Sequence, residues 1–289
     1  MKEELKTKLK DFLNQEQDDE KSKKTIIEYR NAINKFIEFV PEDKNVIDKS
    51  LLIEFKENLT ENNYAVKSKN KYITIVNKFI RFIGYEDLRL KKFKEQRQTS
   101  LDDPIWEQEH KRMLRWAKKL GQEDTYFIIK IFATTGARIE ELKFFTVENL
   151  EKNYIKSAFN KGKYRTLILT NELRRELKQY CKLHKIKSGY IFKSTDPKAK
   201  DGAMWNNSTI WRRLKRIARA AKINPDKIHP HAWRHLFAKE CKRVGIDLDE
   251  LQDILGHNDI KTTAIYTQTS NAEKKMKLER LWKNNKEGK

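Results

Sequence analysis

The chain has 289 residues, which is enough for two domains of ordinary size. It has 63 Lys and Arg against 42 Asp and Glu, which gives a net charge of +21. Solvated helix faces with paired Lys and Glu residues do not explain so large an excess. We therefore expect a polyanion as the partner. Only two cysteines are present, no apolar run approaches the roughly 18 residues of a membrane span, and no apolar segment follows Met1, so we expect a cytoplasmic protein with no membrane association.

The first third of the chain shows helical spacing of apolar residues and no strand pattern. Apolar stripes cover 26–40, 51–59 and 72–83, and Pro41 and Gly84 end the first and the third stripe. We therefore predict a small helical bundle over residues 1–88. The outer face of its last helix is rich in lysines that would either follow DNA phosphates or simply be solvated: Lys67, Lys69, Lys71 and Lys78.

Residues 89–104 are polar and basic and end in Pro104, so we interpret them as a linker to a second domain. Beyond the linker, 105–120 has the spacing of an amphipathic helix, and 126–133 is apolar nearly all round, as in a buried core helix. Arg138 then opens a new helix, and Glu141 follows three residues later. Glu141 could orient the Arg138 guanidinium for a function, or the two side chains could form an ordinary ion pair.

The clearest β signal is a hairpin. Residues 154–156 and 165–169 flank the turn residues 160–163, and 190–192 favour a third strand. Lys161 lies at the predicted hairpin tip. A lysine in such a place is usually just exposed, but its ammonium could also reach a bound phosphate backbone and give a proton to a leaving oxygen.

A strongly basic helix is predicted over residues 208–221. Its apolar residues form one stripe, and basic side chains cover the rest. This density of guanidinium groups suits contacts to phosphates and to the DNA major groove, whereas a merely solvated face is the alternative. The basic residues are Arg212, Arg213, Lys215, Arg216 and Arg219.

Three motifs near the end of the chain gather imidazole, guanidinium and phenol groups: HPHAWRH at 229–235, LGH at 255–257 and TTAIYT at 262–267. A guanidinium can hold two phosphate oxygens, an imidazole can move a proton near neutral pH, and a phenol can act as a nucleophile. This set suits a phosphate better than a metal ion. A zinc site is the alternative, but Arg234 lies among its candidate ligands and would repel a dication; these ligands are His229, His231 and His235.

Together these motifs resemble the tyrosine recombinase (phage integrase) family, in its Xer-like branch. The resemblance rests on TGARIEEL at 135–142, KGK at 161–163, HAWRH at 231–235 and the two motifs that follow, in the family's order and spacing. Ala137 and Trp233 depart from the residues that are common in the family. The resemblance implies a two-domain DNA clamp that is mainly α with a small antiparallel β-sheet. The expected parts are a helical core-binding (SAM-like) domain at 1–88, the linker at 89–104, a catalytic domain at 105–270 and a C-terminal tail at 271–289.

The resemblance also implies a cleavage chemistry. Tyr266 would attack the scissile phosphate, leaving a 3′-phosphotyrosine and a free 5′-hydroxyl. Lys161 would protonate the leaving 5′-oxygen. His231 would assist proton transfer at the nucleophile, and His257 would bond a phosphate oxygen. No metal is expected, because Arg138, Arg234 and Lys161 already supply cations. No cofactor is expected either, because the phosphotyrosine keeps the energy of the phosphodiester bond for ligation.

Charge stabilisation and assembly complete the expectations from the family. Arg138 and Arg234 would neutralise the non-bridging phosphate oxygens as charge builds up. Glu141 and His235 would be supporting residues that hold the arginines and the motif helix. The partners would be double-stranded DNA target sites, with a homotetramer on two sites that exchanges strands through a Holliday junction.

Two other functions fit part of the pattern. A type IB topoisomerase that relaxes DNA would share much of this chemistry. A non-enzymatic architectural DNA-binding protein would share the charge and the helices, but it gives no reason for a tyrosine nine residues after His257. In the tail, Leu278, Leu281 and Trp282 have helical spacing, so this segment would dock either on its own domain or, as in related enzymes, on a neighbouring protomer.

Overall fold

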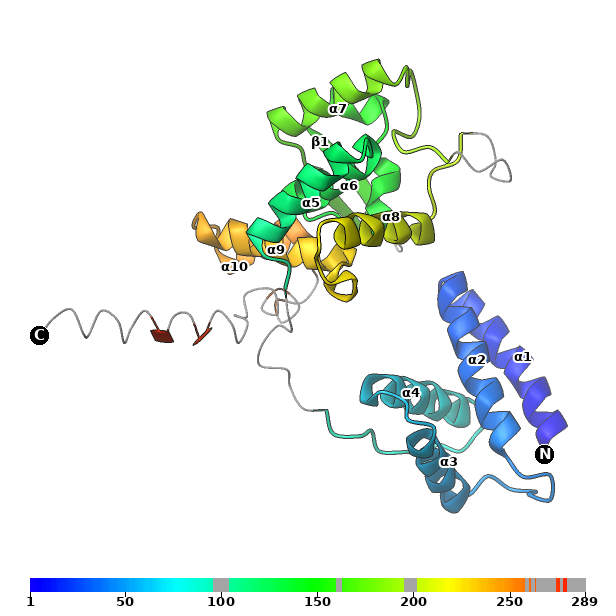
Figure 1. Ribbon diagram of the computed structural model, residues 1–289. Helices are drawn as coiled ribbons and strands as arrows, with labels where there is room; N and C mark the ends of the chain where they lie inside the picture. The colour runs from blue at the N-terminus through cyan, green and yellow to red at the C-terminus, as the bar shows by residue number, and fades with distance from the viewer. Residues whose placement is uncertain are drawn as a thin grey trace, which may run out of the picture. The chain divides into compact units, whose positions relative to one another are not determined.

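The computed structural model describes residues 1–95, 104–159, 163–194 and 202–257, together with the single positions 260, 263, 274, 275, 278 and 279. The chain divides into two compact units, Met1–Arg97 and Gln98–Lys289 (Figure 1). Each unit has a hydrophobic core of its own. The described residues are mostly helical and contain one two-stranded antiparallel sheet, which confirms the predicted fold class. None of the helices in those residues is long and apolar enough to cross a membrane.

The first unit is a bundle of α1 (Lys2–Asp18), α2 (Lys23–Phe39), α3 (Lys49–Glu61) and α4 (Val66–Phe82). Two of these helices begin at side-chain caps, because Ser22 Oγ accepts a hydrogen bond from the backbone N of Thr25 (3.1 Å) and Asp48 Oδ1 accepts one from that of Leu51 (2.8 Å). Each helix contributes a phenylalanine to edge-to-face pairs in the core. These pairs are Phe12 with Phe79 and Phe36 with Phe55.

Helix α1 is absent from the predictions made from the sequence, although its buried residues have helical spacing. They are Leu5, Leu9, Phe12 and Leu13. One turn later, Glu16 is buried at 2% exposure, and its carboxylate pairs with the ammonium of Lys78 on α4. Lys78 is one of the candidate DNA contacts, and the structure uses it to hold α1 against α4.

The second unit is built around α6 (Glu123–Thr135). As predicted, its apolar side chains are buried on several sides, including Ile128, Ile131 and Phe132. Helices α5 (Glu107–Lys119) and α9 (Pro230–Arg243) pack against it, as do α7 (Asn171–Leu183) and α8 (Asn207–Ala220) (Figure 1). Helix α10 (Leu248–Leu255) packs on α9, and three short 3₁₀ helices connect the elements: η1 (Ile139–Phe144), η2 (Glu148–Glu151) and η3 (Pro225–Lys227).

The predicted hairpin is present as β1 (Tyr154–Phe159) and β2 (Lys163–Ile168), and Ile155 faces Leu167 across the pair. The prediction of a third strand over 190–192 is wrong. Tyr190 pairs with Thr146, which follows η1, only through an isolated β-bridge, so no ladder of paired residues forms. A second difference concerns Arg138, which precedes a 3₁₀ helix rather than an α-helix.

Candidate active site

Two helices end in left-handed glycines where the candidate phosphate-binding residues gather. Helix α6 ends at Gly136 (φ 58°) and α10 ends at Gly256 (φ 61°). A Cβ atom at position 136 would lie 2.6 Å from the Phe237 ring, and one at 256 would lie 2.8 Å from Cδ of Arg165. Both positions therefore need glycine for two reasons, the backbone conformation and the close packing. The resulting turns direct the last carbonyl groups of both helices toward the same arginines.

Arg234 joins the two helix ends. It lies on α9 at 1% exposure, and its Nη1 donates to the carbonyl oxygen of Gly136 at 2.6 Å. Its Nη2 donates to the carbonyl oxygen of Leu255 and to Nε2 of His257, the latter at 2.8 Å. Helix C-terminal carbonyls carry partial negative charge, so they stabilise a buried guanidinium and fix its plane before any ligand arrives.

Arg138 lies at the start of η1 and reaches the surface, with 22% of its side chain exposed. Its backbone N donates to Glu141 Oε2 at 2.5 Å, and its Nη2 donates to the carbonyl oxygen of Gly256 at 3.4 Å. The Gly256 turn thus links Arg138 to the same cluster as Arg234. Nη1 of Arg138 lies 3.6 Å from Oε1 of Glu141.

Arg165 is a member of this cluster that the sequence analysis missed. Its Nη1 donates to Glu141 Oε2 at 2.7 Å, and the Glu141 side chain is fully buried. Its Nε donates to the carbonyl oxygen of Ile254 (2.8 Å) and its Nη2 to that of Thr135 (3.1 Å). Glu141 therefore makes its closest ion pair with Arg165, and it holds Arg138 mainly through the backbone. Arg165 in turn attaches strand β2 to the ends of α6 and α10.

His257 is held in one orientation. Its Nδ1 lies 2.8 Å from Oγ1 of Thr263, while its Nε2 faces Arg234. Burial, together with the positive charges of Arg234 and Arg138, lowers the pKa of His257 to about 4. The imidazole is therefore neutral at physiological pH in the absence of a ligand.

His231 and His235 lie on α9, on either side of Arg234 in the sequence. The His231 residue is exposed, yet partial desolvation of its ring and the charges of Arg234 and Arg138 lower its pKa. A neutral imidazole beside these two arginines can accept a proton. Burial lowers the pKa of His235 to about 4, which suits a supporting residue inside the unit.

Two predicted residues, Lys161 and Tyr266, lie outside the described residues. The structure thus brings together Arg138, Arg234 and His257, with His231 one helical turn before Arg234 on α9. Among the described residues, no group of three His, Cys, Asp or Glu side chains is placed to hold a metal ion. The candidate ligands of the zinc alternative, His229, His231 and His235, are all within the described part of α9 and its cap.

The basic face of α8 separates into two kinds of residue. Arg213 pairs with Asp124 at 3.1 Å and stacks on Trp205, with its Cζ atom 4.0 Å from the ring centroid. Lys215 lies 3.6 Å from Asp226. The remaining arginines are exposed, and their spacing places them on one side of the helix. They are Arg212, Arg216 and Arg219.

The lysines of α4 differ in the same way. Lys78 is tied to Glu16, and Lys71 lies 3.0 Å from a carboxylate oxygen of Glu28. Lys69 lies with its ammonium 4.9 Å from the centroid of the Phe93 ring. Lys67 is exposed. Contacts of these lysines with DNA remain a prediction.

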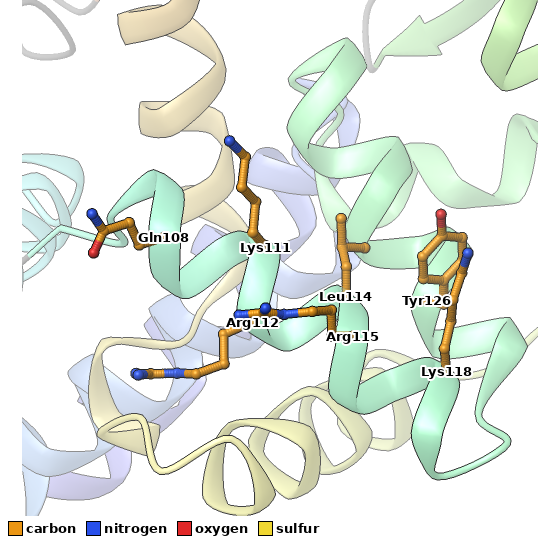
Figure 2. A pocket seen from close by; sticks show the side chains of 7 residues that line it. All are labelled: Gln108, Lys111, Arg112, Leu114, Arg115, Lys118 and Tyr126. Atoms are coloured by element: carbon orange, nitrogen blue, oxygen red, sulfur yellow. The ribbon is translucent and has the colours of Figure 1, made fainter.

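A basic groove on α5 was not predicted from the sequence. It encloses about 630 Å³, and Figure 2 shows the side chains that line it. Four of them are cationic and none is acidic, and the ammonium of Lys118 lies 4.6 Å from the ring centroid of Tyr126. The groove can hold an anion with an adjoining apolar or planar part. Its residues are Gln108, Lys111, Arg112, Leu114, Arg115, Lys118 and Tyr126.

Comparison with known proteins gives matches over both units. The model of the phage integrase family matches residues 105–273, and the model of the phage integrase N-terminal SAM-like domain matches residues 9–86. Tyrosine recombinase XerA of Pyrococcus furiosus is 28% identical over 265 residues, which cover 90% of this chain and 88% of that protein. Tyrosine recombinase XerD of Vibrio cholerae is 26% identical over 265 residues, which cover 85% and 86%.

A similar fold is found in the crystal structure of the XerH site-specific recombinase bound to palindromic difH substrate, a post-cleavage complex. The TM-score is 0.69 and the sequence identity is 20%, over 90% of this chain and 80% of that chain. At this identity the match shows a shared fold.

Proposed function

The chain belongs to the phage integrase family, whose tyrosine recombinase members are DNA strand-transferring enzymes, and we propose that it cleaves and rejoins DNA site-specifically through Tyr266. The observation that supports this most is the arrangement of Arg138, Arg234 and His257 around the ends of α6 and α10. Two guanidinium groups fixed beside an imidazole match the needs of a phosphoryl group whose charge increases in the transition state. The alternative of a DNA-relaxing topoisomerase is not favoured by these relatives.

In the proposed reaction, Oη of Tyr266 attacks the scissile phosphorus and the bond from phosphorus to the 5′-oxygen breaks. The phenol proton passes to a neutral imidazole, for which His231 is the candidate, and Lys161 gives a proton to the departing 5′-oxygen. Attack of a 5′-hydroxyl on the phosphotyrosine reverses these steps and rejoins the strand. Arg138 and Arg234 neutralise the non-bridging oxygens throughout, so we expect cleavage to persist in excess chelator.

The DNA would be held by basic surfaces of both units. The exposed arginines of α8 and Lys67 of α4 are candidates for phosphate contacts, and the α5 groove is a further one. The domain limits that we propose are 1–88, 89–104, 105–270 and 271–289. A homotetramer that exchanges strands through a Holliday junction in the cytoplasm, with the C-terminal tail docked on a neighbouring protomer, completes the proposal.

The decisive experiment uses a nicked suicide substrate, which traps the covalent protein–DNA adduct. Tyr266→Phe should retain DNA binding in a gel-shift titration and form no adduct, because the nucleophilic oxygen is missing. Tyr154→Phe is a matched control, since Tyr154 is an exposed tyrosine on β1 at 50% exposure, and it should form the adduct normally. An adduct that persists in Tyr266→Phe would disprove the assignment of the nucleophile.

Recombination itself is tested with plasmids that carry two target sites or none. A site-specific recombinase should resolve or invert the two-site plasmid and leave the site-free plasmid supercoiled. Steady relaxation of the site-free plasmid without recombination would instead identify a topoisomerase.

A further inference from the structure

Thr263 is a fully buried threonine next to the candidate phosphate-binding cluster. It lies three residues before Tyr266 in the sequence, and its Oγ1 lies 2.8 Å from Nδ1 of His257. On the other side of the same ring, Nη2 of Arg234 lies 2.8 Å from Nε2. The imidazole is thus held at both nitrogens, by two groups of different hydrogen-bonding ability.

The chemistry of the partners determines where the ring proton is. A guanidinium can only donate hydrogen bonds, so Nε2 of His257 must accept from Arg234. A neutral imidazole carries one N–H, which therefore lies on Nδ1 and donates to Oγ1 of Thr263. A hydroxyl can accept this bond, whereas an apolar side chain of the same shape cannot.

The backbone of His257 is fixed as well. Its N donates to the carbonyl oxygen of Gln252 (3.1 Å), and the side-chain amide of Gln252 donates to the carbonyl oxygen of His257 (3.0 Å). The contacts with Gln252 of α10 thus fix the backbone of His257. They do not fix the rotation of its ring or its tautomer. Thr263 is placed to set both.

We propose that Thr263 is a positioning residue that keeps the proton of His257 on Nδ1, so that any proton the ring gains is carried by Nε2, on the side of Arg234 and the phosphate. This inference rests on the proposed function. When a phosphodiester binds, its negative charge favours uptake of a solvent proton at Nε2, which then donates to a phosphate oxygen. The Nδ1–H bond to Thr263 persists in both protonation states and stabilises the imidazolium.

The charged and titratable groups around His257 oppose this proton uptake. The charged ones are Arg234 from α9, Arg138 before η1 and Arg165 from β2, and the titratable one is His231 from α9. Since all four stay in place when Thr263 is changed, the effect of Thr263 can be separated from theirs.

The test compares Thr263→Val, which keeps the shape and loses the hydroxyl, with Thr263→Ser, which keeps the hydroxyl. We expect Thr263→Val to slow adduct formation on the suicide substrate by on the order of tenfold to a hundredfold, as for other groups that orient an imidazole. The decline of the rate at high pH should begin at lower pH in Thr263→Val, because the imidazolium has lost an acceptor. Thr263→Ser should restore both the rate and the pH profile, and single-site DNA binding should stay unchanged in both variants.

A second readout does not depend on activity. In protein labelled with ¹⁵N-histidine, the His257 resonances, identified by their loss in His257→Gln, should show the Nδ1–H tautomer in the unmodified chain. In Thr263→Val the fraction of the Nδ1–H tautomer should be lower, because Arg234 alone then favours it. An Nε2–H tautomer in the unmodified chain overturns the proposal, even if Thr263→Val fails to fold. Equal slowing by Val and Ser also overturns it, since that result indicates packing alone. If the unmodified chain forms no adduct at all, the proposed function fails while the tautomer measurement still decides the role of Thr263.

Discussion

Two groups of arginines in the second unit are used in opposite ways. Arg165 and Arg234 are 4% and 1% exposed, and they donate to backbone carbonyls at the ends of α6 and α10. Arg212, Arg216 and Arg219 are exposed on α8. A guanidinium fixed by carbonyls needs little reorganisation when a phosphate arrives, whereas an exposed one is mobile and screened by salt. We therefore propose that the surroundings of an arginine, more than its presence, decide whether it takes part in the chemistry or in general binding of a polyanion.

The largest effect should come from the buried group. Arg234→Ala removes the cation and leaves the carbonyls of Gly136 and Leu255 without this donor. We expect the rate of adduct formation to fall on the order of a thousandfold, as when a preorganised charge-stabilising donor is removed. Single-turnover cleavage of the suicide substrate measures this rate.

Arg234→Lys separates the charge from the geometry of the group. A single ammonium cannot span both helix ends as the planar fork does, so this variant should also be strongly impaired, although it keeps the charge. Full activity of Arg234→Lys would show that charge alone matters and that the clamp between the helix ends does not.

The buried ion pair should show the next largest effect, on stability. Arg165→Met leaves the fully buried carboxylate of Glu141 without its closest cation, which should lower the free energy of unfolding by roughly 3–5 kcal/mol. Glu141→Gln in the same chain removes the isolated charge, so the double variant should recover part of the loss. Urea unfolding followed by tryptophan fluorescence measures both changes, because all six tryptophans lie after residue 104. Additive losses in the double variant would contradict a direct pair.

This cluster also shows where prediction from sequence reaches its limit. The apolar stripes predict α2, α4 and α6, and the motif spacing identifies Arg138, Arg234 and His257. The place of Arg165 in the cluster could not be predicted, because its partners Thr135 and Ile254 are 30 and 89 residues away. These partners accept through backbone carbonyl groups, which leave no pattern in a sequence. The one usable signal was the alternation of β2, because Arg165 lies on the same face of the strand as the buried Leu167.

The first unit gives a second case. The apolar residues of α1 have helical spacing in the sequence, but the many acidic residues around them obscured it. Helix α1 packs through a few leucines and one phenylalanine, and Glu16 on the same side pairs with Lys78 of α4, 62 residues away. For the same reason the sequence does not distinguish the basic residues that pair with distant acids from those that we propose to contact DNA. Arg213 and its partner Asp124, 89 residues apart, are the matching pair in the second unit.

Acid should weaken the two units differently. Burial lowers the pKa of His110, His235 and His257 to about 4 each, below the usual value of 6.5. Unfolding lets these rings take up protons, so the second unit should lose stability as the pH falls below about 6.5, and increasingly toward pH 4. All six histidines lie after residue 104 and none lies in the first unit.

Thermal unfolding between pH 7 and pH 5 tests this difference. Tryptophan fluorescence reports only on the second unit, and its midpoint should fall over this range. In circular dichroism, which reports on both units, the transition of the first unit should shift less over the same pH range. A tryptophan midpoint that stays constant from pH 7 to pH 5 would mean that these histidines are not buried in neutral form.

The smallest effects belong to the exposed arginines of α8, and they sharpen the contrast with the buried ones. Binding of the unmodified chain should weaken on the order of a thousandfold between 50 and 200 mM salt, because many cations displace counterions from the DNA. Replacing Arg212, Arg216 or Arg219 by Gln should reduce the slope of log affinity against log salt by about one for each phosphate that the variant no longer neutralises.

Arg213→Gln is the matched control on the same helix. Its partners are Asp124 and Trp205, so it should lower the unfolding midpoint and leave the slope unchanged. If Arg213→Gln flattens the salt slope as much as Arg216→Gln, the ion pair opens on DNA, and the division between structural and DNA-binding arginines on α8 does not hold.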